Sequence, residues 1–190
     1  ALIVVAGARG NEASKTDEVT QSRLAQLMGR ALVRAAAEVG AAIIDSGTRE
    51  GIGAIIGGGV AARGFRSGLI GVASAGRVSF PGSANENRPD AAPLEPNHSA
   101  FVLVESETWG DETDVAFALA RELGKETPVV IVLANGDELS KQQVLRAVRM
   151  HVPILVIKGS GGFADQVAEL AQSKPEFVAD SLLAEIISEG

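Results

Sequence analysis

Residues 153–170 read Pro-Ile-Leu-Val-Ile-Lys-Gly-Ser-Gly-Gly-Phe-Ala-Asp-Gln-Val-Ala-Glu-Leu, an apolar run that meets glycines and then a helical pattern. A short apolar run flanked by proline and glycine is typical of a strand buried on both faces. The glycines allow positive φ angles and leave room for a close ligand. The amides of the following helix point beyond the strand end, where the helix dipole favours negative charge. The stretch therefore predicts either a phosphate seat at 159–162 or a tight turn without a ligand.

The same order of strand, turn and helix recurs along the chain. Apolar runs predict further buried strands at 2–6, 41–45, 69–73, 101–105 and 129–133. Helical patterns occur at 19–39, 52–62, 113–123, 140–150 and 177–188. Strands that alternate with helices form parallel sheets covered on both faces. The sequence thus predicts a single Rossmann-like domain over 1–190, a three-layer α/β/α fold with a mostly parallel sheet of about six strands.

The loops after the predicted strands carry the candidate site. In such sheets ligands bind beyond the carboxyl ends of the strands, where the strand order reverses. Glycine-containing loops follow five of the six predicted strands, all but the third. The segment 74–99 holds four of the seven prolines and shows no regular pattern. Structureless loops of that length are usually functional lids or linkers, so we expect a lid that is mobile without ligand.

Composition excludes several classes of function. The formal net charge of −7 argues against a nucleic-acid partner or an anionic membrane surface. The chain has no cysteine, which excludes disulfides and thiolate zinc sites, and two histidines are too few for a histidine-rich metal site. No apolar run reaches membrane-spanning length, and Arg9 interrupts the opening too early for a signal peptide. We expect a cytoplasmic domain, trimmed or excised from a longer protein because Ala1 already lies in a strand.

Two familiar nucleotide motifs are missing. The segment 51–57 resembles a dinucleotide fingerprint, but its glycine spacing is one residue too long, and Gly71 stands where a ribose-binding acid is needed. No Walker pattern with its lysine is present. A redox Rossmann enzyme is therefore disfavoured.

Individual polar residues allow two interpretations each. Asp45 ends the second strand and would hold a ribose or, in the favoured interpretation, a loop amide. His98 would be catalytic or, as is more common, pin its loop by a hydrogen bond. Trp109 would stack on a base or cover an edge of the sheet. Three acids, Asp111, Glu112 and Asp114, would act in acid–base chemistry, bind Mg²⁺ or simply complement a helix dipole.

Three motifs occur together in one order. They are Ser-Gly-Thr-Arg-Glu-Gly at 46–51, Leu-Glu-Pro-Asn-His-Ser-Ala-Phe-Val-Leu-Val at 94–104 and Gly-Ser-Gly-Gly-Phe-Ala-Asp at 159–165. Together they resemble the N-terminal cytosolic region of TRPM channels in its prokaryotic form. That group, called LSDAT, belongs to the SLOG superfamily of Rossmann-like nucleotide-ligand sensors. The resemblance covers essentially the whole chain.

The resemblance implies a site for ADP-ribose or a related nucleotide. The matching positions are Gly7, Asn11, Gly47, Thr48, Gly51, Gly159, Ser160 and Gly161, and adjoining loop residues complete the candidate set: Ala8, Arg9, Arg49, Trp109, Gly110 and Gly162. The channel pattern has arginine where this chain has Gly162. Arg9, Arg49 or Arg66 would then have to supply the phosphate-binding cation.

The same superfamily contains phosphoribohydrolases, which carry a Pro-Gly-Gly-x-Gly-Thr-x-x-Glu signature after the fourth strand. This chain has Glu-Thr-Trp-Gly-Asp-Glu-Thr at 107–113 instead. A hydrolase needs a carboxylate to stabilise a cationic sugar or activate water, and Glu112 or Asp114 would have to serve. We therefore predict a nucleotide sensor without catalytic residues, metal or certain cofactor. A nucleotide N-glycosidic hydrolase is the first alternative, and a homo-oligomeric assembly module with a vestigial pocket is the second.

Overall fold

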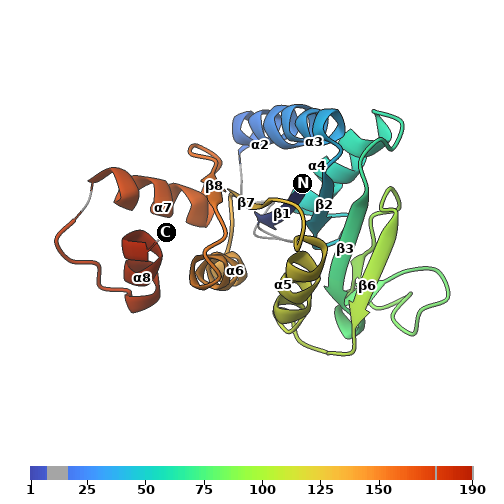
Figure 1. Ribbon diagram of the computed structural model, residues 1–190. Coiled ribbons are helices and arrows are strands. Elements are labelled where there is room, and N and C mark those ends of the chain that lie inside the picture. The colour runs from blue at the N-terminus through green and yellow to red at the C-terminus, as the bar shows by residue number, and fades with distance from the viewer. Residues whose placement is uncertain (8–16, 174, 190) are drawn as a thin grey trace.

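The structure, a computed structural model, describes residues 1–7, 17–173 and 175–189. Its centre is a six-stranded sheet in the order β6-β3-β2-β1-β7-β8, and every neighbouring pair is parallel (Figure 1). The strands are β1 (Leu2–Gly7), β2 (Ala42–Asp45), β3 (Leu69–Ser74), β6 (Ala100–Val104), β7 (Val129–Ala134) and β8 (Ile154–Val156). The predicted fold class and strand count are confirmed.

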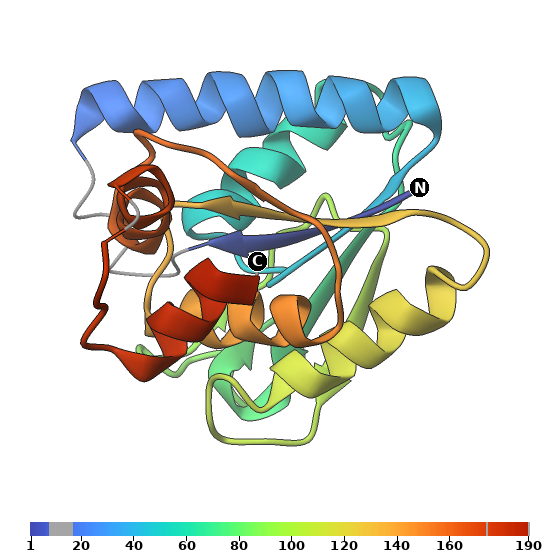
Figure 2. The same ribbon diagram turned by 60° about the vertical axis from the view of Figure 1, so that its left-hand side comes forward.

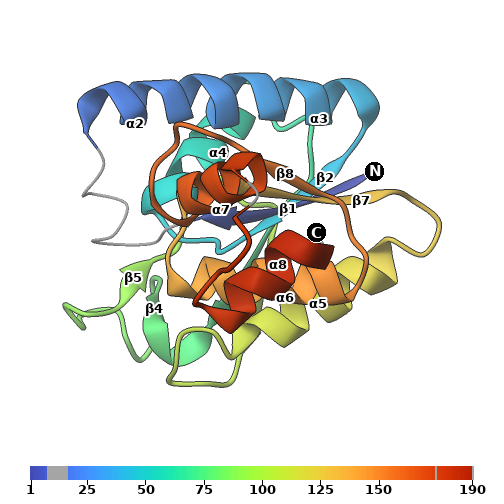
Figure 3. The same ribbon diagram turned by 90° about the vertical axis from the view of Figure 1, so that its left-hand side faces the viewer.

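Helices cover both faces of the sheet (Figure 2). On one face lie a continuous helix made of α2 (Glu18–Leu24), η1 (Ala25–Leu32) and α3 (Val33–Val39), and the helix α4 (Gly51–Ala61). The middle part, η1, has π-type hydrogen bonding. The opposite face carries α5 (Glu112–Leu123), α6 (Glu138–Arg149) and α8 (Ser181–Glu189), while α7 (Gly162–Ser173) lies beside β8 (Figure 3).

Strand β1 contributes side chains to both hydrophobic clusters of the core. Ile3 and Val5 pack in the cluster under α2–α4, and Leu2, Val4 and Ala6 pack in the cluster under α5, α6 and α8. Side chains alternate between the two faces of a strand, so a central strand with helices on both sides is apolar at every position. That is why these strands appear in the sequence as unbroken apolar runs.

The glycines of α4 are explained by close packing. A Cβ on Gly59 would overlap the backbone of Gly29 in η1, so two helix backbones meet there without side chains between them. Glycine inside a helix costs about 1 kcal/mol relative to alanine. The close crossing of α4 and η1 is the structural reason for accepting that cost.

The segment 74–99 is more regular than predicted. It contains η2 (Ala75–Arg77) and two short strands, β4 (Val78–Ser79) and β5 (Ala92–Pro93), which pair in parallel. The side chain of Asn85 donates to the carbonyl of Ala75, and that of Arg88 donates to the carbonyl of Gly76. The segment is thus irregular over most of its length, and short-strand pairing and side-chain hydrogen bonds order parts of it. Its mobility as a lid stays a prediction. Among the helices described, none combines the length and apolarity needed to cross a membrane.

Candidate functional site

The loops at the carboxyl edge of the sheet gather most of the predicted site residues. Strands β2, β3 and β6 extend to one side of β1, and β7 and β8 to the other, so the strand order reverses between β1 and β7. Helices α4, α5, α6 and α7 all begin at this edge because each follows a parallel strand. The predicted residues that lie here, in loops, at strand ends or at the first position of a helix, are Gly7, Gly47, Thr48, Gly51, Trp109, Gly110 and 159–162. Ala8, Arg9 and Asn11 lie outside the described residues.

In the turn between β8 and α7, backbone amides are hydrogen-bonded to a carboxylate of the same segment. The amides of Gly159 and Gly161 donate to the two oxygens of Asp165, at 2.6 and 3.1 Å. The Ser160 hydroxyl donates to the Ile157 carbonyl and accepts from the amide of Asn135, which ties this turn to the end of β7. An external phosphate would have to displace Asp165 from the amides on which the sequence-based prediction relied.

The glycine in place of the channels' arginine has a steric reason. Gly162 has φ +56°, and a Cβ there would overlap the side chain of Asn135 and the carbonyl of Gly136. No side chain fits at this position. One cation near the turn is Arg23 of α2, whose guanidinium lies 3.7 Å from where a Cβ on Gly159 would be.

The other arginines considered lie elsewhere. Arg66 lies with Arg34, Glu38 and Arg63 around a hollow between the C-terminal ends of α3 and α4, at the opposite edge of the sheet. Arg49 lines a pocket over β6. Neither of these two arginines therefore replaces the missing cation at the β8–α7 turn. No motif in the sequence marks Arg23 as a candidate.

The turn between β2 and α4 is held firmly but is not capped. The Arg49 amide donates to the Pro93 carbonyl and the Glu95 amide to the Gly47 carbonyl, both at 2.8 Å. Thr48 is fully buried. The N-cap residue of α4, Glu50, makes no side-chain capping bond, and the first turn of α4 contains no acid. Within the described part of the chain, no side chain caps the amides at the start of α4.

Other helices supply their own caps. The carboxylate of Asp17 accepts from the Thr20 amide at the start of α2, and that of Asp137 accepts from the Ser140 amide at the start of α6. In α7, Asp165 has the equivalent role. The N-cap residue of α5, Asp111, makes no side-chain capping bond either, but the first turn of α5 contains Glu112 and Asp114. Among the described residues, the start of α4 has neither a capping side chain nor an acid in its first turn.

A small recess lies beside the start of α4. Its volume is about 20 Å³, enough for one water-sized group. It is lined by Val5, Gly7, Asp45, Ser46, Ile52, Gly53 and Gln143. The Oδ2 atom of Asp45 is buried and has no hydrogen-bond partner within the described part of the chain. A buried carboxylate oxygen without a donor is unfavourable, so the recess suits a group that donates a hydrogen bond.

The other oxygen of Asp45 belongs to a buried triad formed with His98 and Glu95. Asp45 Oδ1 accepts from the Gly47 amide at 2.7 Å and lies 2.8 Å from His98 Nε2. His98 Nδ1 lies 3.0 Å from Glu95 Oε2, and Glu95 also accepts from the amide and side chain of Asn97. The structure places His98 as a hydrogen-bonding pin and Asp45 as a holder of a loop amide, which are the favoured sequence interpretations.

The His98 imidazole is positioned to carry a charge. Carboxylate oxygens only accept, so both ring nitrogens must be protonated to satisfy these contacts. Burial by itself lowers the pKa of His98, but the hydrogen bonds and charges of Asp45 and Glu95 outweigh it and raise the pKa above its ordinary value. The triad thus places the His98 imidazole between two carboxyl groups. The exposed fraction of the side chain is 0% for His98, 3% for Asp45 and 6% for Glu95.

The acids after β6 have separate roles. Glu112 is buried, and its Oε2 accepts from the Ser74 hydroxyl at 2.7 Å and from the Gly110 amide at 2.9 Å. Asp111 accepts from the Ser106 hydroxyl. The carboxylate of Asp114 is 78% exposed and pairs with Arg146. Of the two carboxylates considered for hydrolysis, only Glu112 therefore lies in the interior at this edge.

The described residues contain no cluster of three or more histidine, aspartate or glutamate side chains arranged to hold a metal ion. In the buried triad, both ring nitrogens of His98 face carboxylate oxygens. Sequence reasoning also missed Ser46, Gly53 and Gln143 in the recess. Ser46 adjoins the selected Gly47, and Gly53 lies two positions after the selected Gly51, whereas nothing in the sequence marks Gln143.

Comparisons with known proteins agree with this architecture. The profile of the LSDAT_prok family, described as SLOG in TRPM, prokaryote, matches residues 1–189. Transient receptor potential cation channel subfamily M member 4 of Rattus norvegicus is 33% identical over 187 positions, covering 80% of this chain and 15% of the channel. Member 5 of Homo sapiens is 28% identical over 186 positions, covering 79% of this chain and 16% of the channel. The chain thus spans a small part of these relatives.

A solved structure has the same fold. The X-ray structure of TM1055, a structural genomics target, superposes with a TM-score of 0.62 at 16% identity, covering 98% of this chain and 96% of that one. The fold is that of a Rossmann-like α/β domain. Within that class, the chain belongs to the prokaryotic LSDAT family of SLOG domains.

Proposed function

We propose that this domain binds a nucleotide-derived ligand, ADP-ribose or a related ribonucleotide, at the start of α4, and acts as a sensor without turnover. The observation that carries the proposal is the unpaired, buried Oδ2 of Asp45 beside the uncapped α4 N-terminus. Membership of the SLOG family supports the choice of ligand class.

The recess and the start of α4 suit two different chemical groups of one ligand. Asp45 Oδ2 repels a phosphate but accepts a hydrogen bond, so we assign it a ribose hydroxyl. The amides at the start of α4 attract negative charge, so we assign them a phosphate. A ribonucleotide carries both groups within one molecule, whereas inorganic phosphate carries only the second.

Calorimetric titration of the domain with AMP and ADP-ribose tests this assignment. Asp45→Asn keeps the size of the side chain and an oxygen acceptor for Gly47 and His98, but it places an amide donor at the recess. We expect it to weaken AMP binding about tenfold, the loss for one charge-assisted hydrogen bond. Binding of 2′,3′-dideoxy-AMP, which lacks both hydroxyls, should be weak and equal in the two proteins.

Two outcomes contradict the proposal. Equal losses for AMP and the dideoxy analogue in Asp45→Asn would show that no hydroxyl contacts this carboxylate. Absence of binding or thermal stabilisation by any nucleotide would favour the assembly role instead, with a self-associating helix face.

One observation favours hydrolysis as a second candidate. Glu112 is a buried carboxylate at the ends of β3 and β6, the setting in which an acid can act on a sugar. Incubation with AMP and ADP-ribose, followed by chromatography of free base and ribose 5-phosphate, separates the two functions. We expect no release. Release that scales with protein concentration and disappears in Glu112→Gln would establish the hydrolase.

A further inference from the structure

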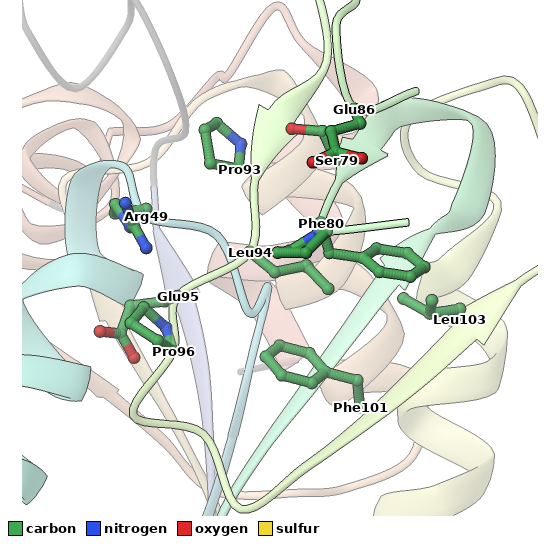
Figure 4. A pocket seen from close by; sticks show the side chains of 11 residues that line it. Arg49, Ser79, Phe80, Glu86, Pro93, Leu94, Glu95, Pro96, Phe101 and Leu103 are labelled. Atoms are coloured by element: carbon green, nitrogen blue, oxygen red, sulfur yellow. The ribbon is translucent and has the colours of Figure 1, made fainter. Parts of the chain in front are cut away.

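A second and larger hollow lies over the edge strand β6, away from the recess. Its volume is about 640 Å³, within the range of about 300–1,000 Å³ for small-molecule sites. The floor is made by Phe101 and Leu103 of β6, and the walls by Phe80 and Leu94 of the overlying segment (Figure 4). The lining is mainly apolar.

One cation stands at the rim of this pocket. Arg49 is exposed, and its guanidinium makes no hydrogen bond or ion pair with any other described residue. The two carboxylates nearby are turned to other partners: Glu86 accepts from the Gly82 amide, and Glu95 accepts from Asn97 and faces His98. The pocket therefore offers apolar area together with one unpaired positive charge.

We propose that the pocket over β6 is a second ligand site, for a molecule with a flat apolar body and one anionic group. The apolar body lies on Phe101 and Leu103, and the anion binds Arg49. Aromatic and proline side chains suit a flat ring system, and a guanidinium binds a carboxylate or sulfonate in a bidentate manner. This proposal does not depend on a nucleotide at the recess.

His98 connects residues of the pocket with Asp45 of the recess, although the two hollows have no lining residue in common. Phe101 stacks on His98 with ring centroids 5.1 Å apart, and His98 bonds to Asp45 at the recess. Glu95 lines the pocket, and its carboxylate is hydrogen-bonded to the other ring nitrogen of His98, Nδ1. A ligand in the pocket would thus contact Phe101, and the Phe101 ring stacks on His98 of the triad.

Titration of the 190-residue chain with 8-anilinonaphthalene-1-sulfonate, a flat dye with one sulfonate, tests the proposal, and uncharged N-phenyl-1-naphthylamine is the matched probe. We expect one dye molecule per chain. Arg49→Gln should weaken the sulfonate dye about tenfold and change the uncharged dye less than about twofold. Leu103→Glu should weaken both probes about tenfold by placing charge on the apolar floor.

Control variants separate specific binding from misfolding. Phe177→Ser removes a large exposed apolar side chain elsewhere and should leave both probes unchanged. Phe80→Ser, on the opposite wall, should repeat the Leu103→Glu result if the pocket is the site. Each variant is first shown by circular dichroism and urea unfolding to be folded.

Three results would overturn the proposal. Dye binding unchanged by Leu103→Glu and Phe80→Ser would place the dye elsewhere. A wild-type dimer that Leu103→Glu converts to monomer would make this surface a contact between copies. Competition between AMP and the dye would make the pocket part of the nucleotide site, whereas AMP affinity unchanged in Leu103→Glu supports two separate sites.

Discussion

The turns after β2 and after β8 both join a parallel strand to a helix through glycines, yet their backbone donors have different partners. After β8, the amides of Gly159 and Gly161 are bound by Asp165. After β2, no described side chain caps the start of α4, and Asp45 Oδ2 has no hydrogen-bond partner among the described residues. A glycine-rich turn therefore does not identify an anion site by itself, because a carboxylate one helical turn later can satisfy the same amides.

The largest effect is expected in α4, where Gly57→Ala tests how closely the helix must approach the buried triad. A Cβ on Gly57 would overlap the carboxylate of Glu95, whereas a Cβ on the neighbouring Gly58 would meet open space. We expect Gly57→Ala to lower the free energy of unfolding by about 3 kcal/mol. The control Gly58→Ala should raise it by up to about 1 kcal/mol. Urea unfolding of both measures the difference, and equal effects would contradict the close approach.

Asp165→Asn should make the β8 turn resemble the β2 turn. Loss of the carboxylate leaves the amides of Gly159 and Gly161 weakly bound, at a cost of about 1–2 kcal/mol in unfolding free energy. Sulfate should restore part of the loss by occupying the freed amides. The measurement is the extra stabilisation by sulfate in the variant over that in the wild type. An equal sulfate response in both proteins would show that the turn has no latent anion site.

The pH dependence of stability tests the triad behind the β2 turn. The folded pKa of His98 is raised, so the triad's contribution is fully present below the unfolded pKa of about 6.5 and is lost as pH rises through the folded pKa. In that window the unfolding free energy should fall by at most about 1.4 kcal/mol per pH unit. His98→Gln should remove this slope. A slope that persists in the variant would assign it to other groups.

The smallest effect concerns the cation beside the β8 turn. Arg23→Gln should weaken ADP-ribose binding about twofold to threefold at low salt and not at high salt, because an exposed charge is screened. Arg66→Gln, at the opposite edge of the sheet, is the matched control and should leave the affinity unchanged. Equal losses in the two variants would reflect net charge alone.

The sequence by itself determined the fold. Unbroken apolar runs such as 2–6 and 129–133 are required of strands buried on both faces, and the alternation with helices leaves a parallel sheet as the solution. The motifs at 46–51, 94–104 and 159–165 were enough to identify the family, which the comparison confirms. The carboxyl edge as the location of the loops followed from the same alternation.

Only the tertiary structure decided which polar atoms remain unpaired. Asp45 and His98 are 53 positions apart, and their contact depends on how β2 and the 94–99 loop meet in space. Nothing local indicates that Asp165 folds back on its own turn while Glu50 does not cap α4. Hydrogen-bond partners over such separations are set by the packing of whole helices, strands and loops. A single sequence indicates these elements, but it does not indicate which of their residues come into contact.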